Sequence, residues 1–448
     1  MNALAKIYTQ LPPLPCNIIS CGINLDAPYK TIPLIEASKD IQADVLLIYQ
    51  PKKKLALLQI FNQALQYLKA GGQLMIVDHF ATSVTIDSKT VNLLSDCLAL
   101  AQRFNFHITC QAQYNYTNTL LILRLSEKPK WRLSVLTDND IPQMLALFEN
   151  TFHHKMTPAL YQWKYAAELA PIIGIWEGHQ LIASLGGMPR EVLFFGKHQI
   201  VMQIGDVMVD VKKRGILSRT GPFFRMTATL LEQYAGFGKS FLCIYGFPNE
   251  RHIKLAEHLG LYTEVGRMIA LSWLPLTSRP RFMSHLQTVN KQNFETLAPH
   301  IDYLWQSMAA DLKQSIIGQR NSHYLKQRYL DHPEQNYHLL LVKNRWSGRI
   351  YGLLVLQYKN KQCDIIDIIA HPKEIPLLIL HARRMASFNQ CQRLYCQITL
   401  AFSHYFKSAE HHVESLSIPI ASDTWSHGPL PEELNNHWWL MAGDMDCR

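Results

Sequence analysis

The stretch from residue 200 to residue 262 constrains this chain more than any other. Residues 200–209 place apolar side chains in alternation, which is typical of a half-buried strand. After a cationic turn, a helix begins at Pro222, because proline costs nothing at the first helical position. A second apolar strand is expected at 241–245, and a second helix near Asn249. This order of strand, basic turn, helix, strand and helix predicts a layered α/β unit.

The turn between the first strand and the first helix carries the most informative chemistry. A helix N-terminus presents unpaired N–H groups and about half a positive charge. Glycine allows a backbone to approach a ligand closely, and the turn has Gly215 and Gly221. Its cations are Lys212, Lys213, Arg214 and Arg219. We therefore expect the turn to hold a phosphate-bearing ligand; the alternative is a solvated basic loop.

Two segments of this stretch match motifs of one enzyme superfamily. Val207-Met208-Val209 followed by Arg214-Gly215, and Asn249 followed by Leu259-Gly260-Leu261-Tyr262, resemble the fourth strand, acyl-CoA loop and final motif of the GNAT acyltransferases. The resemblance covers residues 131–275 and implies acetyl-CoA or another acyl-CoA as co-substrate. No register of the turn fits the family's six-residue signature, and Gly221 is expected to replace its missing glycine. The residues implied to bind the co-substrate are Val207, Val209, Lys212, Lys213, Arg214, Gly215, Arg219, Gly221 and Asn249.

The same resemblance suggests where acyl transfer to an amine would occur. GNAT enzymes polarise the thioester carbonyl with a backbone N–H where the fourth strand splays from the fifth, which implies residues 205–207 here. An amine with a pKa near 10 needs a base, and the candidates are Asp206, Glu191 and Asp210. We favour Asp206 because it lies on the expected fourth strand, although each carboxylate could instead pair with Arg190 or Arg214. Ala256 stands where the family often has its tyrosine acid.

The first 128 residues predict a separate α/β domain. Strands are expected at 43–49 and 73–78, helices at 55–68 and 91–104, and a hairpin at 107–125. The run at 68–78 resembles the second half of a Rossmann-like class I SAM-dependent methyltransferase. The residues before Asp44 contain one glycine, Gly22, so the glycine loop that would hold SAM is missing. We expect a partial, degenerate methyltransferase-like domain that does not bind SAM.

The last third of the chain echoes the middle third. Residues 324–329 repeat the pattern of residues 160–165, and a strand, turn and strand follow in both places. The strand expected at 364–370 passes straight to a helix without glycine. The sequence thus predicts tandem GNAT-like domains, with mixed sheets flanked by helices, over 129–276 and 281–448. Residues 278–281 would form a linker, and Trp438-Trp439 either a packed final strand or a segment that closes the substrate cleft.

Composition sets limits on partners and location. The chain has 448 residues, a net charge of +9 and nine cysteines without a C-x-x-C pair, which favours an anionic partner and reduced thiols. Lysines run together at 52–54, but the other basic residues are dispersed, so nucleic acid is not indicated. Neither a metal site nor a membrane span is expected. The N-terminus does not resemble a signal peptide, and we expect a cytoplasmic protein.

These observations lead to one main functional hypothesis. The chain is expected to be an acyl-CoA-dependent N-acyltransferase that acts on an amine, with a small molecule or sugar amine as possible acceptor. A non-catalytic CoA-responsive or scaffold protein is the alternative, because the loop departs from the family signature. An active SAM methyltransferase is the least expected of the three.

Overall fold

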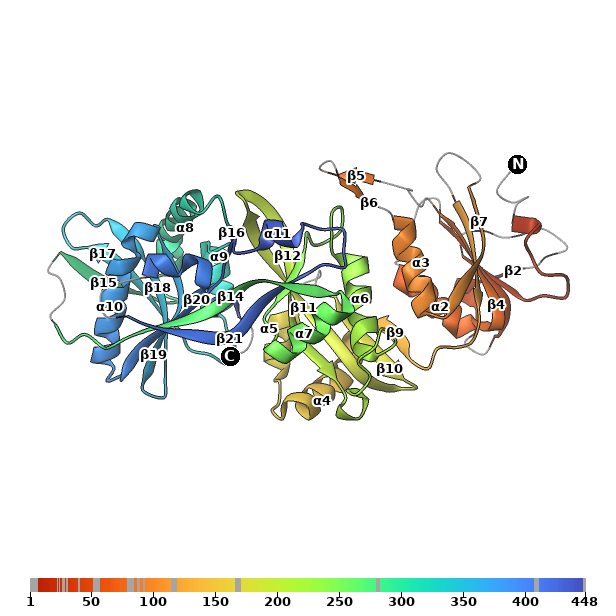
Figure 1. Cartoon of the computed structure of the whole chain (residues 1–448), viewed down its shortest axis with the longest axis horizontal. Coiled ribbons are helices and arrows are strands. Elements are labelled where there is room, and N and C mark those ends of the chain that lie inside the picture. Colours follow the sequence, from red (N-terminus) through yellow and green to blue (C-terminus); the bar gives the residue numbers. More distant parts are fainter. Residues whose placement is uncertain are drawn as a thin grey trace. The chain divides into compact units, whose positions relative to one another are not determined.

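The structure is a computed structural model of the chain (Figure 1). It describes residues 7–21, 23, 25, 29, 31–38, 41–50, 57–78, 84–86, 89–91, 93–113, 119–165, 171–278, 283–406 and 411–445. The lysine run at 52–54, Gly22 and most of the expected linker at 278–281 lie outside these residues.

The chain divides into two compact units. Unit 1 consists of Met1–His154, Pro171–Leu185 and Val207–Gln233, and unit 2 of Lys155–Ala170, Gly186–Asp206 and Tyr234–Arg448. Two strands, β11 (Gln180–Phe194) and β12 (Lys197–Val209), have residues in both units. Each unit is described separately below.

Unit 1 begins with a six-stranded sheet of order β2-β1-β3-β4-β8-β7, on which two amphipathic helices pack (Figure 1). Strands β1 to β4 are parallel, and β8 runs antiparallel to both β4 and β7. Apolar side chains of β1, β3, β4 and β8 form its core. The elements are β1 (Ile18–Cys21), β2 (Thr31–Pro33), η1 (Leu34–Glu36), β3 (Ala43–Gln50), α2 (Leu57–Tyr67), β4 (Leu68–Asp78), β5 (Val84–Ile86), β6 (Lys89–Val91), α3 (Leu93–Arg103), β7 (Phe106–Gln113) and β8 (Thr119–Leu125).

One expectation for this sheet was wrong in detail. The glycine turn at 69–72 was expected to separate a helix from a strand beginning at 73, but β4 already starts at Leu68. The ladder with β3 shifts register between Ala43 and Val45, and Gly71 has a φ of +79°. The glycine therefore bends the start of the strand, a conformation that a side chain would disfavour, while the helix ends at Tyr67.

The remainder of unit 1 holds the start of the middle third. Its elements are β9 (Arg132–Val135), η2 (Asp138–Asp140), α4 (Ile141–Phe152), β10 (Ile172–Glu177), η3 (Val211–Lys213) and α6 (Pro222–Tyr234), together with parts of β11 and β12. A capping box starts η2, in which Thr137 N donates to Asp140 Oδ2 at 2.8 Å, and α4 follows directly at Ile141. Helix α6 begins at Pro222, as predicted.

Unit 2 contains a mixed sheet of order β15-β17-β18-β19-β20-β14-β21-β13-β12, with its helices on the faces. Its main hydrophobic core lies between β17 to β20 and helices α8 and α10. The elements are α5 (Pro158–Tyr165), β13 (Ile244–Gly246), α7 (Glu250–Leu259), β14 (Tyr262–Trp273), β15 (Ser284–Val289), α8 (Phe294–Asp311), β16 (Ile316–Gly318), α9 (Ser322–Leu325), η4 (Lys326–Leu330), β17 (His338–Asn344), β18 (Ile350–Lys359), β19 (Gln362–Ala370), η5 (Pro372–Glu374), α10 (Ile375–Phe388), β20 (Arg393–Thr399), η6 (Leu400–Phe406), β21 (His412–Asp423), α11 (Pro431–Leu434), β22 (Trp438–Trp439) and η7 (Ala442–Asp444).

The end of the chain completes the sheet. Strand β21 lies between β13 and β14: Ser422 pairs with Tyr245 and also with Thr263. Trp438 and Trp439 form β22, which runs parallel to β16, and both side chains are buried. The packed-strand interpretation of the two tryptophans is therefore confirmed.

The second half lacks a glycine loop, as expected. Strand β19 ends at Ala370, the three-residue η5 follows, and α10 starts at Ile375 with Pro376 in its first turn. None of the helices in the described ranges has the length and apolar character to cross a membrane. Within those ranges the cysteines are free thiols, and no cluster of three or more His, Cys, Asp or Glu residues could hold a metal ion.

Candidate functional site

Strands β12 and β13 are paired over only a short length. Met202 pairs with Ile244 and Gln203 with Tyr245, after which β13 ends at Gly246 while β12 continues to Val209. A Cβ added at Gly246 would lie 3.6 Å from Ile204. The backbone of β12 beyond Gln203 therefore leaves the ladder with β13 in the region where a splay was expected.

Asp206 lies in this part of β12 in an unusual conformation. Its φ is +48°, a left-handed value that Asp tolerates better than most residues. Its Oδ2 accepts a 2.7 Å hydrogen bond from Lys164 Nζ and a 2.5 Å bond from Tyr165 Oη. The Lys164 and Asp206 side chains are 5% and 10% exposed. The carboxylate is thus a nearly buried ion pair whose partner is Lys164 rather than Arg190 or Arg214.

A glycine makes room for this cluster. A Cβ at Gly186 on β11 would lie 2.7 Å from Tyr165 Oη, so only glycine lets the tyrosine cross the strand. Sequence reasoning did not select Lys164, Tyr165 or Gly186 as site residues. The internal repeat could have indicated Tyr165, because residues 324–329 repeat the pattern of residues 160–165 and align Tyr165 with Tyr329.

The other two candidate bases have different surroundings. Glu191 is an exposed residue of β11 whose backbone O accepts from Gln319 N at 2.8 Å. Asp210 caps η3, because its Oδ1 accepts from Lys212 N at 2.8 Å. Of the three predicted carboxylates, Asp206 is the one with two side-chain donors from a single helix, α5.

The basic loop lies in unit 1, and residues 211–220 are largely exposed. Lys213 Nζ donates to Glu177 Oε2 at 2.7 Å, and this hydrogen bond is the main cause of the lowered pKa of Glu177. Arg214 Nε donates to the backbone O of Val209 at 2.9 Å. Arg219 lies over the Phe224 ring at 5.7 Å. Lys213 is therefore engaged by a carboxylate, while Lys212 is exposed to solvent.

The two loop glycines differ sharply. A Cβ at Gly221 would lie 2.2 Å from the backbone O of Ile216, whereas a Cβ at Gly215 would meet no atom within 4 Å. The loop's own backbone therefore requires glycine at position 221, immediately before α6. Of the two valines predicted to contact the co-substrate, Val207 is exposed and Val209 is half-buried.

Two further sequence candidates lie in unit 2. Asn249 caps α7 by accepting from His252 N at 2.9 Å, and Gly260 ends this helix with a φ of +75°. Ala256 is buried, and its backbone O accepts from Leu261 N. The cap accounts for Asn249 without a ligand, and Ala256 offers no acidic side chain.

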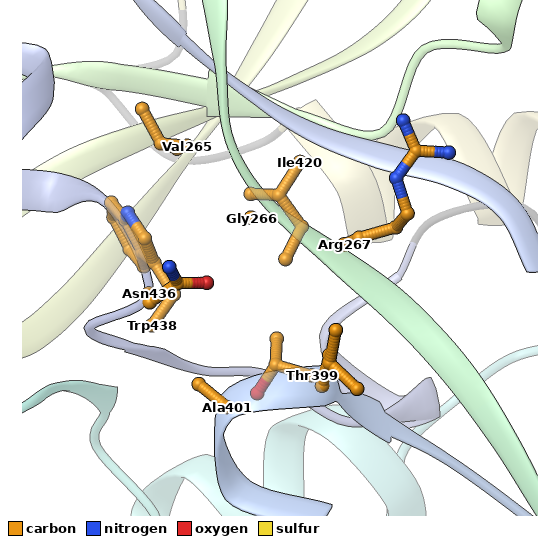
Figure 2. Close-up of a pocket in the computed structure, with 9 residues that line it drawn as sticks. Val265, Gly266, Arg267, Thr399, Ala401, Ile420, Asn436 and Trp438 are labelled. Carbon is orange, nitrogen blue, oxygen red and sulfur yellow. The ribbon is translucent and has the colours of Figure 1, made fainter. Parts of the chain in front are cut away.

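Unit 2 also has a small pocket that sequence reasoning did not find (Figure 2). It is lined by Val265, Gly266, Arg267, Thr399, Leu400, Ala401, Ile420, Asn436 and Trp438. Arg267 is held in ion pairs with Glu250 and Glu264. Trp438 Nε1 and Thr399 Oγ1 are buried and have no hydrogen-bond partner among the described residues. The Trp438 ring stacks on Tyr245 of β13, with 4.7 Å between ring centres.

Comparisons with known proteins show what the chain is similar to. The family described as acetyltransferase (GNAT) domain matches residues 132–254. A search of curated proteins found no match. A crystal structure from Enterococcus faecalis V583, described as a probable N-acyltransferase, is 13% identical with a TM-score of 0.53, covering 66% of this chain and 73% of that one. A GCN5-related N-acetyltransferase from Kribbella flavida is 15% identical with a TM-score of 0.49, covering 65% and 70%.

The family match accounts for the β9-to-α7 region, and the fold likeness to the Enterococcus structure extends over a longer part of the chain. The methyltransferase-like interpretation of residues 1–128 remains a prediction, because the family match begins at residue 132. Over residues 132–254, the chain thus matches the GNAT acetyltransferase domain family.

Proposed function

We propose that the protein is an acyl-CoA-dependent N-acyltransferase that uses the amine of a small molecule or sugar as acceptor. The observation that carries this proposal is the exposed basic loop that ends in Gly221 at the start of α6, within the GNAT domain. Such a helix start favours an anion through its N–H groups and its dipole.

The loop has the charges that a pyrophosphate needs. Lys212 and Arg219 are exposed, and Arg214 uses Nε to hold the end of β12 while its other nitrogens remain as donors. Lys213 and Glu177 form an ion pair that fixes η3, the first part of the loop. Charge-assisted hydrogen bonds from such groups to phosphate oxygens are each worth about 1.5–3 kcal/mol.

In the proposed transfer step, β12 would supply both a hydrogen-bond donor and a base. The amine nitrogen attacks the thioester carbonyl, the C–N bond forms and the C–S bond breaks, and CoA leaves as a thiolate. A backbone N–H of β12 beyond Gln203 would stabilise the developing oxyanion. Asp206 would accept the proton from the amine at its Oδ1 atom, because Lys164 and Tyr165 both donate to Oδ2. The thiolate is then protonated by solvent.

The test is CoA binding measured by isothermal titration, beside turnover of a model amine. Arg214→Ala should weaken CoA binding about 10- to 150-fold, as expected for one charge-assisted contact. Asp206→Asn should leave CoA affinity unchanged and slow turnover by about a hundredfold or more. Lys359→Ala removes an equal charge from an exposed position of β18 and serves as control.

Absence of CoA binding by the parent protein would overturn the proposal and favour the non-catalytic alternative. Equal affinity of the parent and Arg214→Ala would remove the loop from the site. Titration of SAM should give no saturable binding, because one glycine precedes Asp44. Micromolar binding of SAM would overturn the degenerate interpretation of residues 1–128.

A further inference from the structure

Helix α9 of unit 2 continues into a turn of π-helix, η4, over Lys326–Leu330. Such turns are rare and occur frequently at functional sites, because the extra residue per turn redirects neighbouring side chains and carbonyls. Here the turn carries Gln327, Arg328 and Tyr329, and each of these makes a contact far away in the sequence. The proposed reaction gives no role to any of the three.

Arg328 is the centre of these contacts. Its side chain is buried, and its guanidinium donates to the backbone O of Gly443 through Nε and to that of Met445 through Nη2, each at 2.9 Å. These two bonds use two of the five N–H donors of the guanidinium, and the guanidinium also faces an aromatic ring. Its carbon lies 5.0 Å from the centre of the Trp163 ring, a distance at which a cation and an aromatic face attract.

Trp163 belongs to α5, the helix that also carries Lys164 and Tyr165. Its Nε1 donates to the backbone O of Gln327 at 2.9 Å. The His332 ring lies 4.3 Å from the Trp163 ring. Thr157 Oγ1, just before α5, donates to Glu334 Oε1 at 2.6 Å. The segment from Gln327 to Glu334 therefore holds α5 at several points, all within unit 2.

We propose that Arg328 is a positioning residue, which fixes α5 through Trp163 and so keeps Lys164 and Tyr165 on Asp206. The C-terminal residues Gly443 and Met445 orient its guanidinium. This inference rests on the proposed function only where it assigns Asp206 to the reaction. The arrangement is sensitive to geometry because Lys164 and Tyr165 follow Trp163 directly, so a rotation of α5 moves both donors away from Oδ2 together.

The experiment compares Arg328→Lys with Lys326→Gln in the full-length protein. Lysine keeps the charge but cannot bond two carbonyls in a plane while facing a ring. Lys326 lies in the same turn, but it forms an exposed pair with Glu295, so it is the matched control. Hydrogen exchange of the peptide covering 158–165 should accelerate at least tenfold in Arg328→Lys, with β17 and β18 unchanged. Turnover per folded molecule should fall about tenfold at an unaltered KM for acyl-CoA, and unchanged exchange in β17 and β18 would distinguish this result from a general loss of folding.

A second variant keeps the test decisive if Arg328→Lys does not fold. Trp163→Phe retains an aromatic face and removes the bond to Gln327, so it should show a smaller acceleration confined to the same peptide. Parent-like exchange of α5 in Arg328→Lys would overturn the inference, as would acceleration spread evenly over unit 2. A parent protein without transferase activity, in which Arg328→Lys still loosens α5, would overturn the proposed function and leave the positioning role supported.

Discussion

The two regions of the chain that were predicted to be GNAT-like, called the first and second halves below, contain the same tyrosine–aspartate pair. In the first half, Tyr165 Oη donates to Asp206 on β12; in the second, Tyr329 Oη donates to Asp367 on β19 at 2.8 Å. Four residues after each aspartate, a side chain caps a short 3-10 helix: Asp210 accepts from Lys212 N, and His371 Nδ1 accepts from Lys373 N at 3.3 Å. The repeat expected from the sequence thus includes a shared hydrogen-bonding pattern.

Beyond the cap the halves diverge. In the first half, the basic loop separates η3 from α6, whereas in the second half η5 leads directly into α10. The aspartates also differ in burial and partner. Asp206 pairs with Lys164 and is 10% exposed, whereas Asp367 pairs with Arg320 and both are fully buried.

This difference separates features that belong to the fold from features that the proposed reaction would use. A tyrosine–aspartate pair that recurs in a half without a phosphate loop belongs first to the fold, so its presence cannot by itself assign a reaction. What the first half alone has is an aspartate with some exposure and a positive φ, and a basic loop between the 3-10 helix η3 and the next helix, α6. The predictions below use matched changes in the two halves.

The largest effect is expected from Asp367→Asn. Burial raises the pKa of Asp367 although Arg320 opposes that shift, and the change would leave Arg320 with Asp444 as its one remaining charged partner among the described contacts. Breaking a buried pair costs about 3–5 kcal/mol of unfolding free energy. Urea denaturation should show this loss, while Asp331→Asn, in an exposed pair with Lys291, should change stability by less than about 1 kcal/mol. If Asp367→Asn lowered the unfolding free energy by less than about 1 kcal/mol, that result would contradict the structural role of Asp367.

The sharpest comparison comes from Tyr165→Phe and Tyr329→Phe. Both remove one hydrogen bond to a carboxylate, worth about 1.5–3 kcal/mol. Tyr329→Phe should lower the unfolding free energy by that amount with unchanged kcat, because Asp367 is fully buried. Under the proposed function, Tyr165→Phe should also lower kcat by about tenfold or more, because Asp206, the proposed proton acceptor, would lose one of the two donors that hold its carboxylate. Equal kcat in the two variants would mean that both pairs are structural.

The sequence predicted best those elements whose boundaries are set by residues next to them in the chain. The start of α6 at Pro222 and the start of α7 at Asn249 are each fixed by a few neighbouring residues, and both were predicted correctly. The absence of a loop after β19 was also visible, because no glycine separates the strand from the proline.

Contacts between distant residues could not be predicted in the same way. Lys164 reaches Asp206 across 42 positions, and β21 joins β13 across about 177. On charge alone, Arg190 and Arg214 were equally good candidates for an ion pair with Asp206. In the structure, Arg190 Nε donates to the buried Gln203 instead. Gly221 was predicted to bind the co-substrate, and that role stays a prediction; the structure shows a separate need for glycine there, because the Ile216 carbonyl oxygen approaches closely.

The next prediction separates the two loop glycines, which the second half lacks. Gly221→Ala would place a Cβ against a backbone oxygen, so the loop must rearrange, and CoA affinity should fall at least tenfold. Gly215→Ala meets open space, so it should leave the fold unchanged and weaken CoA binding only if a phosphate lies against that backbone. Isothermal titration of CoA into both variants measures these two affinities. Parent-like affinity of Gly221→Ala would show that CoA does not use the loop.

The smallest effect concerns His332, through which the second half contacts α5. Burial, followed by the nearby charge of Arg328, lowers the pKa of His332 to about 4, compared with about 6.5 in an unfolded chain. Between these values the unfolded chain binds a proton that the folded chain does not, so stability falls as the pH drops from about 6.5 towards 4. Thermal melting from pH 7.5 to 4.5 should therefore show a shallower decline in His332→Gln, whereas the exposed control His404→Gln should follow the parent. Identical slopes in all three proteins would mean that the Trp163–His332 contact does not depend on a neutral ring, and the support of α5 by the second half would then rest on Arg328 and Gln327.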